Sequence, residues 1–98
     1  MVPSLITAIV LIHAATDSIP ETAQAIADID GVSEVYSCAG DVDLVAVLRV
    51  SSHERLAEVI PGQIGKGPGV VDTVTHIAFR SYSSADTESA FDIGIDDS

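Results

Sequence analysis

Two segments of this sequence are apolar on both faces of any strand that they could form. Residues 4–14, Ser-Leu-Ile-Thr-Ala-Ile-Val-Leu-Ile-His-Ala, are almost continuously apolar and rich in β-branched side chains. Residues 44–50 repeat this pattern. Runs of this kind predict strands whose two faces are both buried. The fold must therefore cover both sides of a sheet.

The rest of the chain alternates helical and strand patterns in a definite order. Helices are expected from Ser18 to Asp30 and from Ser51 to Ile60, because apolar residues recur there at helical spacing. The expected strands cover residues 4–14, 32–39, 44–50 and 70–79. The order β-α-β-β-α-β predicts an α+β, ferredoxin-like fold with a four-stranded antiparallel sheet.

The ends of the two helices carry recognisable signals. A serine followed three residues later by a glutamate predicts a capping box, here Ser18 with Glu21 and Ser51 with Glu54. The pair Pro61-Gly62 should break or kink the second helix, because a proline ring clashes with the preceding turn.

Two helices can cover only one face of a four-stranded sheet, so the second apolar face needs another partner. In the first strand, one face would carry Leu5, Ile9 and Leu11, and the other Ile6, Ala8, Val10 and Ile12. In the third strand, one face would carry Val45 and Val47, and the other Leu44, Ala46 and Leu48. A contiguous apolar surface of this size marks an interaction site. The pattern therefore predicts an obligate homodimer packed sheet to sheet, a dimeric α/β sandwich or barrel.

The chain is expected to divide into a packed domain, residues 1–80, and an acidic C-terminal tail, residues 81–98. Five of the 15 acidic residues lie in this tail. Phe91, Ile93 and Ile95 alternate there with polar residues or glycine. The tail is thus either a loose solvated segment or a short added strand on a sheet edge.

Charge and cysteine content restrict the partners and the compartment. With 15 acidic against 4 basic residues, the formal net charge of −11 argues against direct nucleic-acid binding. The apolar stretch 5–15 is about half the length of a transmembrane helix. The first positive charge is Arg49, so neither a membrane span nor a signal peptide is expected. The single cysteine, Cys38, permits no disulfide framework, and a cytoplasmic location is expected.

The candidate catalytic and metal-binding residues match no established motif. The glycine-rich loop 62–67 follows a helix and leads into a strand, the reverse of a phosphate-binding loop. His13, His53 and His76 lie at no metal-ligand spacing. Cys38 lacks an electropositive setting and is expected to be a small packing residue. We therefore expect no catalytic residue, no metal and no cofactor.

Two aspartates, Asp41 and Asp43, flank Val42 in the turn before the third strand. Aspartate after glycine is common in turns, so one interpretation is turn chemistry alone. The other depends on position, since Asp43 stands at the head of an apolar strand. If the turn lies at an interface, the buried carboxylate needs donors, which the ammonium group of an amino acid would supply.

Three short stretches of this chain together resemble a known family. They are the turn Gly40-Asp41-Val42-Asp43-Leu44 with the preceding residues 35–39, the segment Ile29-Asp30-Gly31-Val32, and the segment Gly67-Pro68-Gly69-Val70. In order and spacing they resemble the effector-binding domain, called RAM, of the Lrp/AsnC transcriptional regulators. The resemblance covers roughly residues 4–79.

This resemblance implies dimers that assemble further into tetramers, octamers or rings, with an amino acid or related small metabolite bound between dimers. The ligand-binding residues that it implies are Gly40, Asp41, Val42 and Asp43 of the GxxD turn and Thr75, His76, Ile77 and Ala78 of the last strand. Asp43 would be the partner of the ligand amino group. His76 stands where the family often has an aromatic residue.

The helix-turn-helix of full-length regulators is absent before the first strand, so the chain resembles the stand-alone form and should not bind DNA itself. It would act by co-assembly with full-length Lrp/AsnC regulators. Two other classes stay open. One is a small dimeric α/β-barrel enzyme, a monooxygenase or isomerase with His13 as its candidate residue. The other is a ligand-free, ACT-like assembly module.

Overall fold

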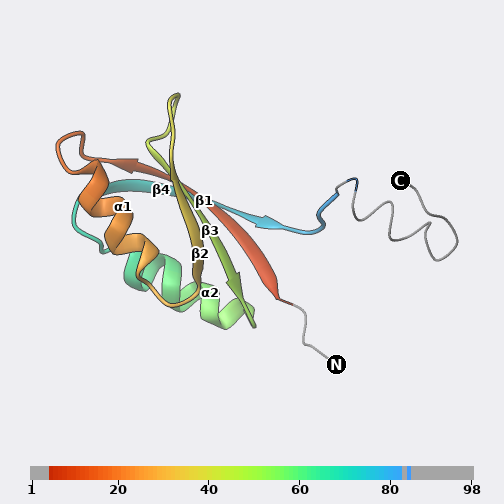
Figure 1. Cartoon of the computed structure of the whole chain (residues 1–98). Helices are drawn as coiled ribbons and strands as arrows, with labels where there is room; N and C mark the ends of the chain where they lie inside the picture. Colours follow the sequence, from red (N-terminus) through yellow and green to blue (C-terminus); the bar gives the residue numbers. More distant parts are fainter. Residues whose placement is uncertain (1–4, 83, 85–98) are drawn as a thin grey trace, which may run out of the picture.

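Four antiparallel strands and two helices form the part of the chain that the structure, a computed structural model, describes: residues 5–82 and residue 84. The elements are β1 (Ile6–Ala14), α1 (Ile19–Ala27), β2 (Val32–Ser37), β3 (Leu44–Val50), α2 (His53–Val59), a π-helical turn η1 (Ile60–Ile64) and β4 (Val70–Ala78) (Figure 1). This arrangement confirms the ferredoxin-like α+β fold. The two alternatives for the tail, a loose segment or a short added strand, fall on residues that lie almost wholly outside the described ones.

The two strands that are apolar on both faces occupy the centre of the sheet. The strand order is β2-β3-β1-β4. β1 pairs with β3 from Ile6 opposite Val50 to Ile12 opposite Leu44, and with β4 on its other side. Edge strands β2 and β4 are more polar, because they meet fewer neighbours and more water. The hydropathy of each strand therefore follows its place in the sheet.

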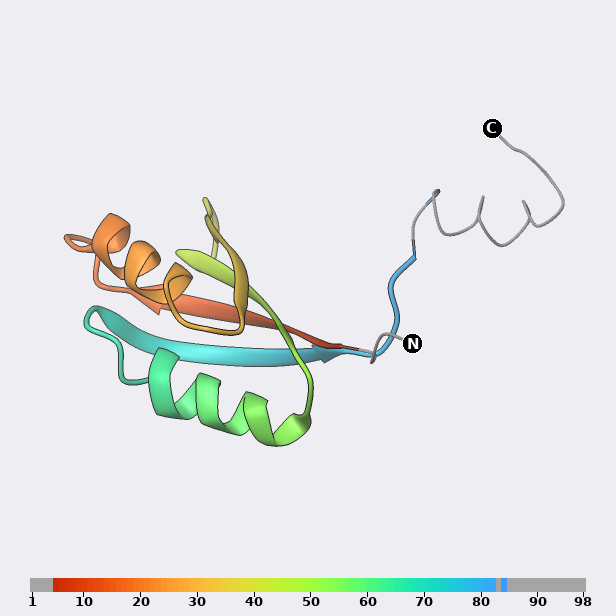
Figure 2. The ribbon, with the colours of Figure 1, turned by 60° about the horizontal axis from the view of Figure 1, so that its bottom comes forward.

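Both helices pack on one face of the sheet, where they cover the even-numbered side chains of the central strands. The buried strand residues are Ala8, Val10, Ile12 and Ala14 of β1 and Leu44, Ala46, Leu48 and Val50 of β3. Ile26 of α1, Leu56 and Val59 of α2 and Ile64 of η1 complete this core. The helices lie apart, with strands visible between them (Figure 2).

No helix covers the opposite face, which we call the open face and define by its apolar residues Ile9, Leu11, Tyr36, Val45, Val47 and Val74. Within one copy of the chain these residues stay partly or largely accessible, with Tyr36 51% and Val74 48% exposed. The helix side of β4 is also incompletely covered, since Ile77 is 44% exposed. One copy therefore leaves substantial apolar surface in water.

The predicted capping boxes are wrong in detail. Ser18 occupies the N-cap of α1, but its hydroxyl donates to the Ala15 carbonyl at 3.4 Å and caps no helical N–H. The N-cap of α2 is Ser52, whose Oγ accepts from the Arg55 N–H at 3.1 Å. Ser52 has the extended backbone that an N-cap needs, which displaces the cap by one residue from Ser51.

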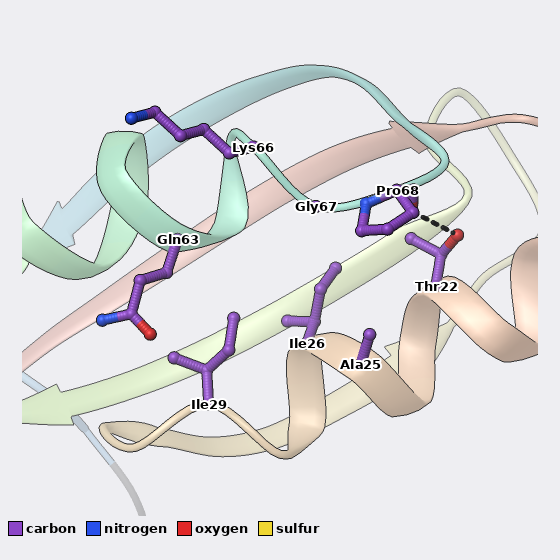
Figure 3. A pocket seen from close by; sticks show the side chains of 8 residues that line it. All are labelled: Thr22, Ala25, Ile26, Ile29, Gln63, Lys66, Gly67 and Pro68. Atoms are coloured by element: carbon purple, nitrogen blue, oxygen red, sulfur yellow. Dashed lines mark hydrogen bonds between the residues drawn. The ribbon is translucent and has the colours of Figure 1, made fainter.

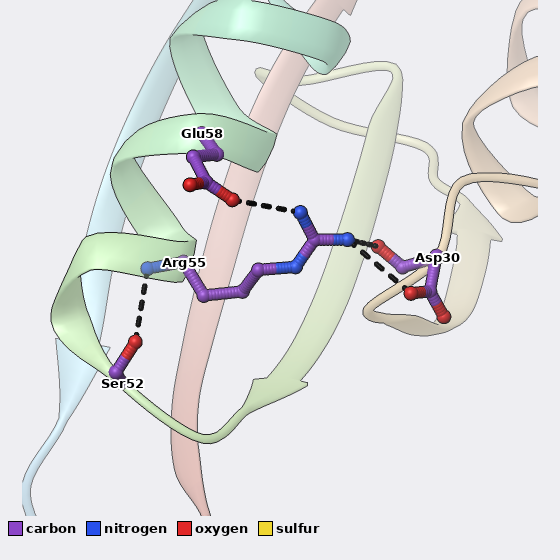
Figure 4. A network of polar contacts seen from close by, with 4 residues as sticks. All are labelled: Asp30, Ser52, Arg55 and Glu58. Atoms are coloured by element: carbon purple, nitrogen blue, oxygen red, sulfur yellow. Dashed lines mark hydrogen bonds and ion pairs between the residues drawn. The ribbon is translucent and has the colours of Figure 1, made fainter.

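Arg55 joins the start of α2 to the loop that leads into β2 (Figure 4). Its guanidinium donates to Glu58 at 2.9 Å and to the carboxylate of Asp30 at 3.3 Å. A further bond reaches the Asp30 carbonyl at 3.4 Å. The hydrogen bond to Glu58 is the main cause that raises the pKa of Arg55. This network holds α2 beside the end of the α1–β2 connection.

The Pro61-Gly62 pair ends α2 as predicted, since α2 stops at Val59 and the chain continues as η1. The wider turn is closed by the Gly65 N–H, which donates to the Ile60 carbonyl at 2.7 Å. Within the described range, no helix is long and apolar enough to cross a membrane.

Candidate functional site

The GxxD turn forms the tip of the β2–β3 hairpin, which projects beyond the neighbouring strands (Figure 1). Cys38 N–H donates to the Asp43 carbonyl at 2.9 Å and closes the hairpin. Gly40 has φ +138°, a backbone conformation that favours glycine, and a Cβ there would meet no atom within 4 Å. The turn therefore offers open backbone at its tip.

Asp43 ties this turn to the end of β1. Its Oδ2 accepts from the Ala14 N–H at 2.9 Å, and its own N–H donates to the Ile12 carbonyl at 3.0 Å. Its Oδ1 has no hydrogen bond from any residue that the structure describes. Asp43 thus has one carboxylate oxygen engaged in the fold and one available to a ligand.

His13 contacts the same turn, which the sequence analysis missed. Its Nε2 lies 2.7 Å from the Asp41 carbonyl, to which the ring N–H donates. The pairing of Ile12 with Leu44 brings the next residue of β1 beside the turn before β3. Only this register could have revealed the contact between His13 and the turn, and the register cannot be known until the pairing of the strands is known. One of the two ring nitrogens of His13 is thus bound to the turn.

Cys38 is exposed at this hairpin, so its predicted role as a packing residue is wrong. The residue directly follows Ser37, the last residue of β2, in the connection to β3. Across the described residues, no group of three or more histidine, cysteine, aspartate or glutamate side chains could hold a metal ion.

Within one copy, the second predicted half of the site lies away from the turn. Thr75 pairs with Val10 and Ala78 with Thr7, whereas Asp43 bonds to Ile12 and Ala14. At about 3.3 Å per residue, the two halves are offset by roughly 7–17 Å along the strands, with β1 between them. Within one copy, β1 therefore separates the two predicted halves of the site.

The four β4 residues are also divided between the faces of the sheet. His76 and Ala78 pair with Ile9 and Thr7 and share the open face with them, while Thr75 and Ile77 point to the helix side. All four are exposed in one copy. They offer a histidine on one face and a hydroxyl on the other.

Glu34, Tyr36 and Arg49 form a polar cluster at the β2 side of the open face. The Tyr36 hydroxyl donates to the Glu34 carboxylate, and Arg49 lies 3.7 Å from the same carboxylate. The hydrogen bond to Glu34 and the negative charge of that residue raise the pKa of Tyr36. A charged and hydrogen-bonded rim therefore borders the apolar residues.

A separate groove of about 270 Å³ lies between α1 and the loop after η1 (Figure 3). Its walls are apolar at Ala25, Ile26, Ile29 and Pro68. Lys66 also lines the groove, and its amino group extends away from it (Figure 3). At one end Thr22, 2% exposed, donates to the Pro68 carbonyl at 3.1 Å and closes α1 against the loop.

In the glycine-rich loop beside this groove, two backbone N–H groups donate to carbonyl groups of the same chain. Gly65 N–H donates to the Ile60 carbonyl, and Gly67 N–H donates to the Ile64 carbonyl at 3.0 Å. These two donors therefore satisfy the chain itself, whereas a phosphate-binding loop directs its N–H groups outward.

Comparison with known families gives one clear match. A sequence model of the family described as "Lrp/AsnC ligand binding domain" matches residues 7–87. An uncharacterised HTH-type transcriptional regulator of Pyrococcus furiosus is 36% identical over 76 residues, which cover 74% of this chain and 51% of the relative. One from Pyrococcus horikoshii is 37% identical over 59 residues, 60% of this chain and 39% of the relative. The chain thus spans about half or less of the length of these curated relatives.

Two solved structures share this fold. The crystal structure of TTHA0845 from Thermus thermophilus superimposes with a TM-score of 0.75 at 41% identity, covering 80% of this chain and 98% of that one. A transcriptional regulator of Neisseria meningitidis superimposes with a TM-score of 0.71 at 12% identity, over 80% of this chain and 52% of that one. The second comparison supports the fold alone.

Proposed function

Since this chain belongs to the Lrp/AsnC ligand-binding domain family, we propose that it binds an amino acid or a related small metabolite at the Gly40–Asp43 turn. The observation that carries this proposal is the half-engaged carboxylate of Asp43. One oxygen is held by Ala14, and the other is available to an ammonium group. The open backbone at Gly40 lets a ligand approach closely. The Neisseria meningitidis structure is a complex with L-Met, which supports this ligand class.

The binding site would be completed by a second copy of the chain. Because β1 separates the turn from residues 75–78 within one copy, the turn of one copy would meet the 75–78 segment of another. The apolar open face supports a homodimer packed sheet to sheet, since it would otherwise remain in water. Such dimers would associate further into a tetramer, an octamer or a ring.

The regulatory output would come from assembly. We expect this domain to join full-length Lrp/AsnC regulators through the same surfaces and to change their activity when the ligand binds. With a net charge of −11, the chain would leave the DNA contacts to those partners. The cytoplasm is the compartment in which such partners would be met.

Calorimetric titration with each of the amino acids tests ligand binding. Asp43→Asn keeps an acceptor for the Ala14 N–H but removes the negative charge, so we expect at least tenfold weaker binding of the best ligand. Asp28→Asn is the matched control, since Asp28 is exposed at the C-cap of α1, on the helix side of the sheet, and its carboxylate accepts a hydrogen bond from Gln24. Equal affinity in Asp43→Asn and the parent chain would refute the role of Asp43.

Sedimentation analysis tests the sheet-to-sheet dimer separately. Val45→Lys places a charge in the middle of the open face and should shift the chain to monomer. Ala57→Lys adds the same charge on an exposed position of α2 and should leave the assembly unchanged. A Val45→Lys chain that sediments like the parent would show that the dimer uses another surface.

A further inference from the structure

A polar basin lies at the opposite end of the sheet from the GxxD turn. It is formed where β1 begins and β4 ends, and its volume is about 340 Å³. Arg49 and Arg80 supply two positive charges, and Thr7 and Ser81 supply two hydroxyl groups. Leu5 and Phe79 add apolar surface. Ala78 also lines the basin and is shared with the 75–78 segment of the proposed amino-acid site, whereas the groove beside α1 shares none of its residues.

The charge of this basin is opposite to that of the chain. Only four basic side chains accompany the 15 acidic ones, yet two of the four line this basin and no acidic side chain does. Arg49 is held only loosely by Glu34, at 3.7 Å with both side chains nearly half exposed. Among the described residues Arg80 forms no ion pair. Both guanidinium groups can therefore accept an added anion.

The basin also has an apolar side. Phe79 is fully exposed and Leu5 is 56% exposed, although both border the basin. An aromatic ring beside two guanidinium groups suits a ligand with one negative charge and a hydrophobic body. A bare inorganic anion would leave this apolar surface unused.

We propose that this basin binds the carboxylate of a small organic acid whose apolar part packs against Phe79 and Leu5. The guanidinium groups of Arg49 and Arg80 would hold the carboxylate, with the hydroxyls of Thr7 and Ser81 as further donors. Thr7 and His13 are six residues apart on β1, so the basin lies roughly 20 Å from the turn. Apart from Ala78, its residues are distinct from those of the proposed amino-acid site, so the inference does not rest on the GxxD turn.

The carboxylate could come from two sources with the same chemistry. One is a free organic acid. The other is an acidic residue of the chain itself, because Asp86, Glu88, Asp92, Asp96 and Asp97 follow Ser81 in sequence. A variant in which these five residues become asparagine or glutamine distinguishes the sources. If the acidic residues of the chain compete with an added acid for the basin, this variant binds the added acid more than twofold tighter than the parent. If they do not compete, the variant and the parent bind it with equal affinity.

The experiment is calorimetric titration of the full chain with benzoate and with benzamide, its uncharged counterpart. We expect saturable benzoate binding that is at least tenfold tighter than benzamide binding. The double variant Arg49→Gln/Arg80→Gln should weaken benzoate binding at least tenfold. Lys66→Gln removes one of the two remaining positive charges, on the helix side, and should change it less than twofold.

Asp43→Asn separates this proposal from the previous one, since it should impair amino-acid binding and leave benzoate binding intact. Equal affinities for benzoate and benzamide would overturn the inference. So would a double arginine variant that binds benzoate as tightly as the parent while its circular dichroism spectrum is unchanged.

Discussion

The Asp43 carboxylate accepts a hydrogen bond from the backbone N–H of Ala14, a residue 29 positions earlier in the chain. This bond fastens the β2–β3 turn to the end of β1. The residue that the family resemblance marks for ligand binding therefore also stabilises the fold. Substitutions at position 43 must be chosen so that the two roles can be separated.

Asp43→Ala should lower the free energy of unfolding by about 1–2 kcal/mol, because the Ala14 N–H loses its acceptor in a half-buried position. Asp43→Asn retains a side-chain oxygen and should lose less than half as much. Urea denaturation followed by circular dichroism measures both. Equal stability of the alanine variant and the parent would show that water replaces the carboxylate at no cost.

Gly69→Ala should destabilise the fold far more than Gly40→Ala, although both glycines have positive φ. A Cβ at Gly69 would lie 2.1 Å from Thr22 Oγ1, whereas a Cβ at Gly40 meets no atom within 4 Å. We expect a loss of about 1 kcal/mol at Gly40 from backbone strain alone and about 3 kcal/mol or more at Gly69.

Thermal unfolding of the two glycine variants measures this difference. Since the backbone strain is present in both, the excess at Gly69 reports the steric conflict with Thr22. Similar melting temperatures would mean that the loop before β4 shifts to accommodate the methyl group.

Thr22→Val should cost about 1 kcal/mol of stability, because it removes the hydroxyl that donates to the Pro68 carbonyl while preserving side-chain shape. Thr22→Ser keeps the donor and serves as the control. The hydroxyl is almost fully buried, so water cannot take its place in the folded chain. Chemical denaturation measures both variants, and a valine variant as stable as the parent would contradict the role of the hydroxyl.

The Tyr36 hydroxyl should titrate above the usual tyrosine pKa of 10.0, because Glu34 accepts its hydrogen bond and opposes its ionisation. Tyr82→Phe leaves Tyr36 as the single tyrosine, so its tyrosinate absorbance can be followed directly. Adding Glu34→Gln should move the midpoint down. Because the folded pKa is raised, this interaction favours folding below pH 10 and is lost as the pH rises through the folded pKa.

An unchanged midpoint in Glu34→Gln would contradict the assigned cause. The outcome would then point to the sheet surface around Tyr36 as the origin of the shift.

The central strands of the fold could be predicted from the sequence because a strand that is buried on both faces is an almost continuous run of apolar residues. β3 is predicted at its observed bounds, Leu44–Val50, and the end of α2 is correctly placed before Pro61. Helix caps were less predictable. Ser51 and Ser52 carry the same chemistry, and only the backbone conformation of Ser52 decides between them.

The site was predictable only in part, because its contacts depend on strand pairing. The GxxD turn lies at a hairpin as expected, but the bond from His13 to the Asp41 carbonyl follows from the register of β1. The distance between the turn and residues 75–78 follows from the position of β1 between β3 and β4. Neither register nor strand order can be read from the periodicity of a single segment.

The central position of β1 also sets the order in which this chain can complete its sheet. β1 is synthesised before the other described strands, whereas its neighbour β4 is the last of them. At about 5–20 residues per second, roughly 1.5–6 s pass between the completion of β3 at Val50 and that of β4 at Ala78. During this interval the nascent chain presents an unpaired edge of its most apolar strand. Seven acidic residues against one basic residue in positions 1–50 then provide like-charge repulsion, which opposes edge-to-edge association of neighbouring nascent chains.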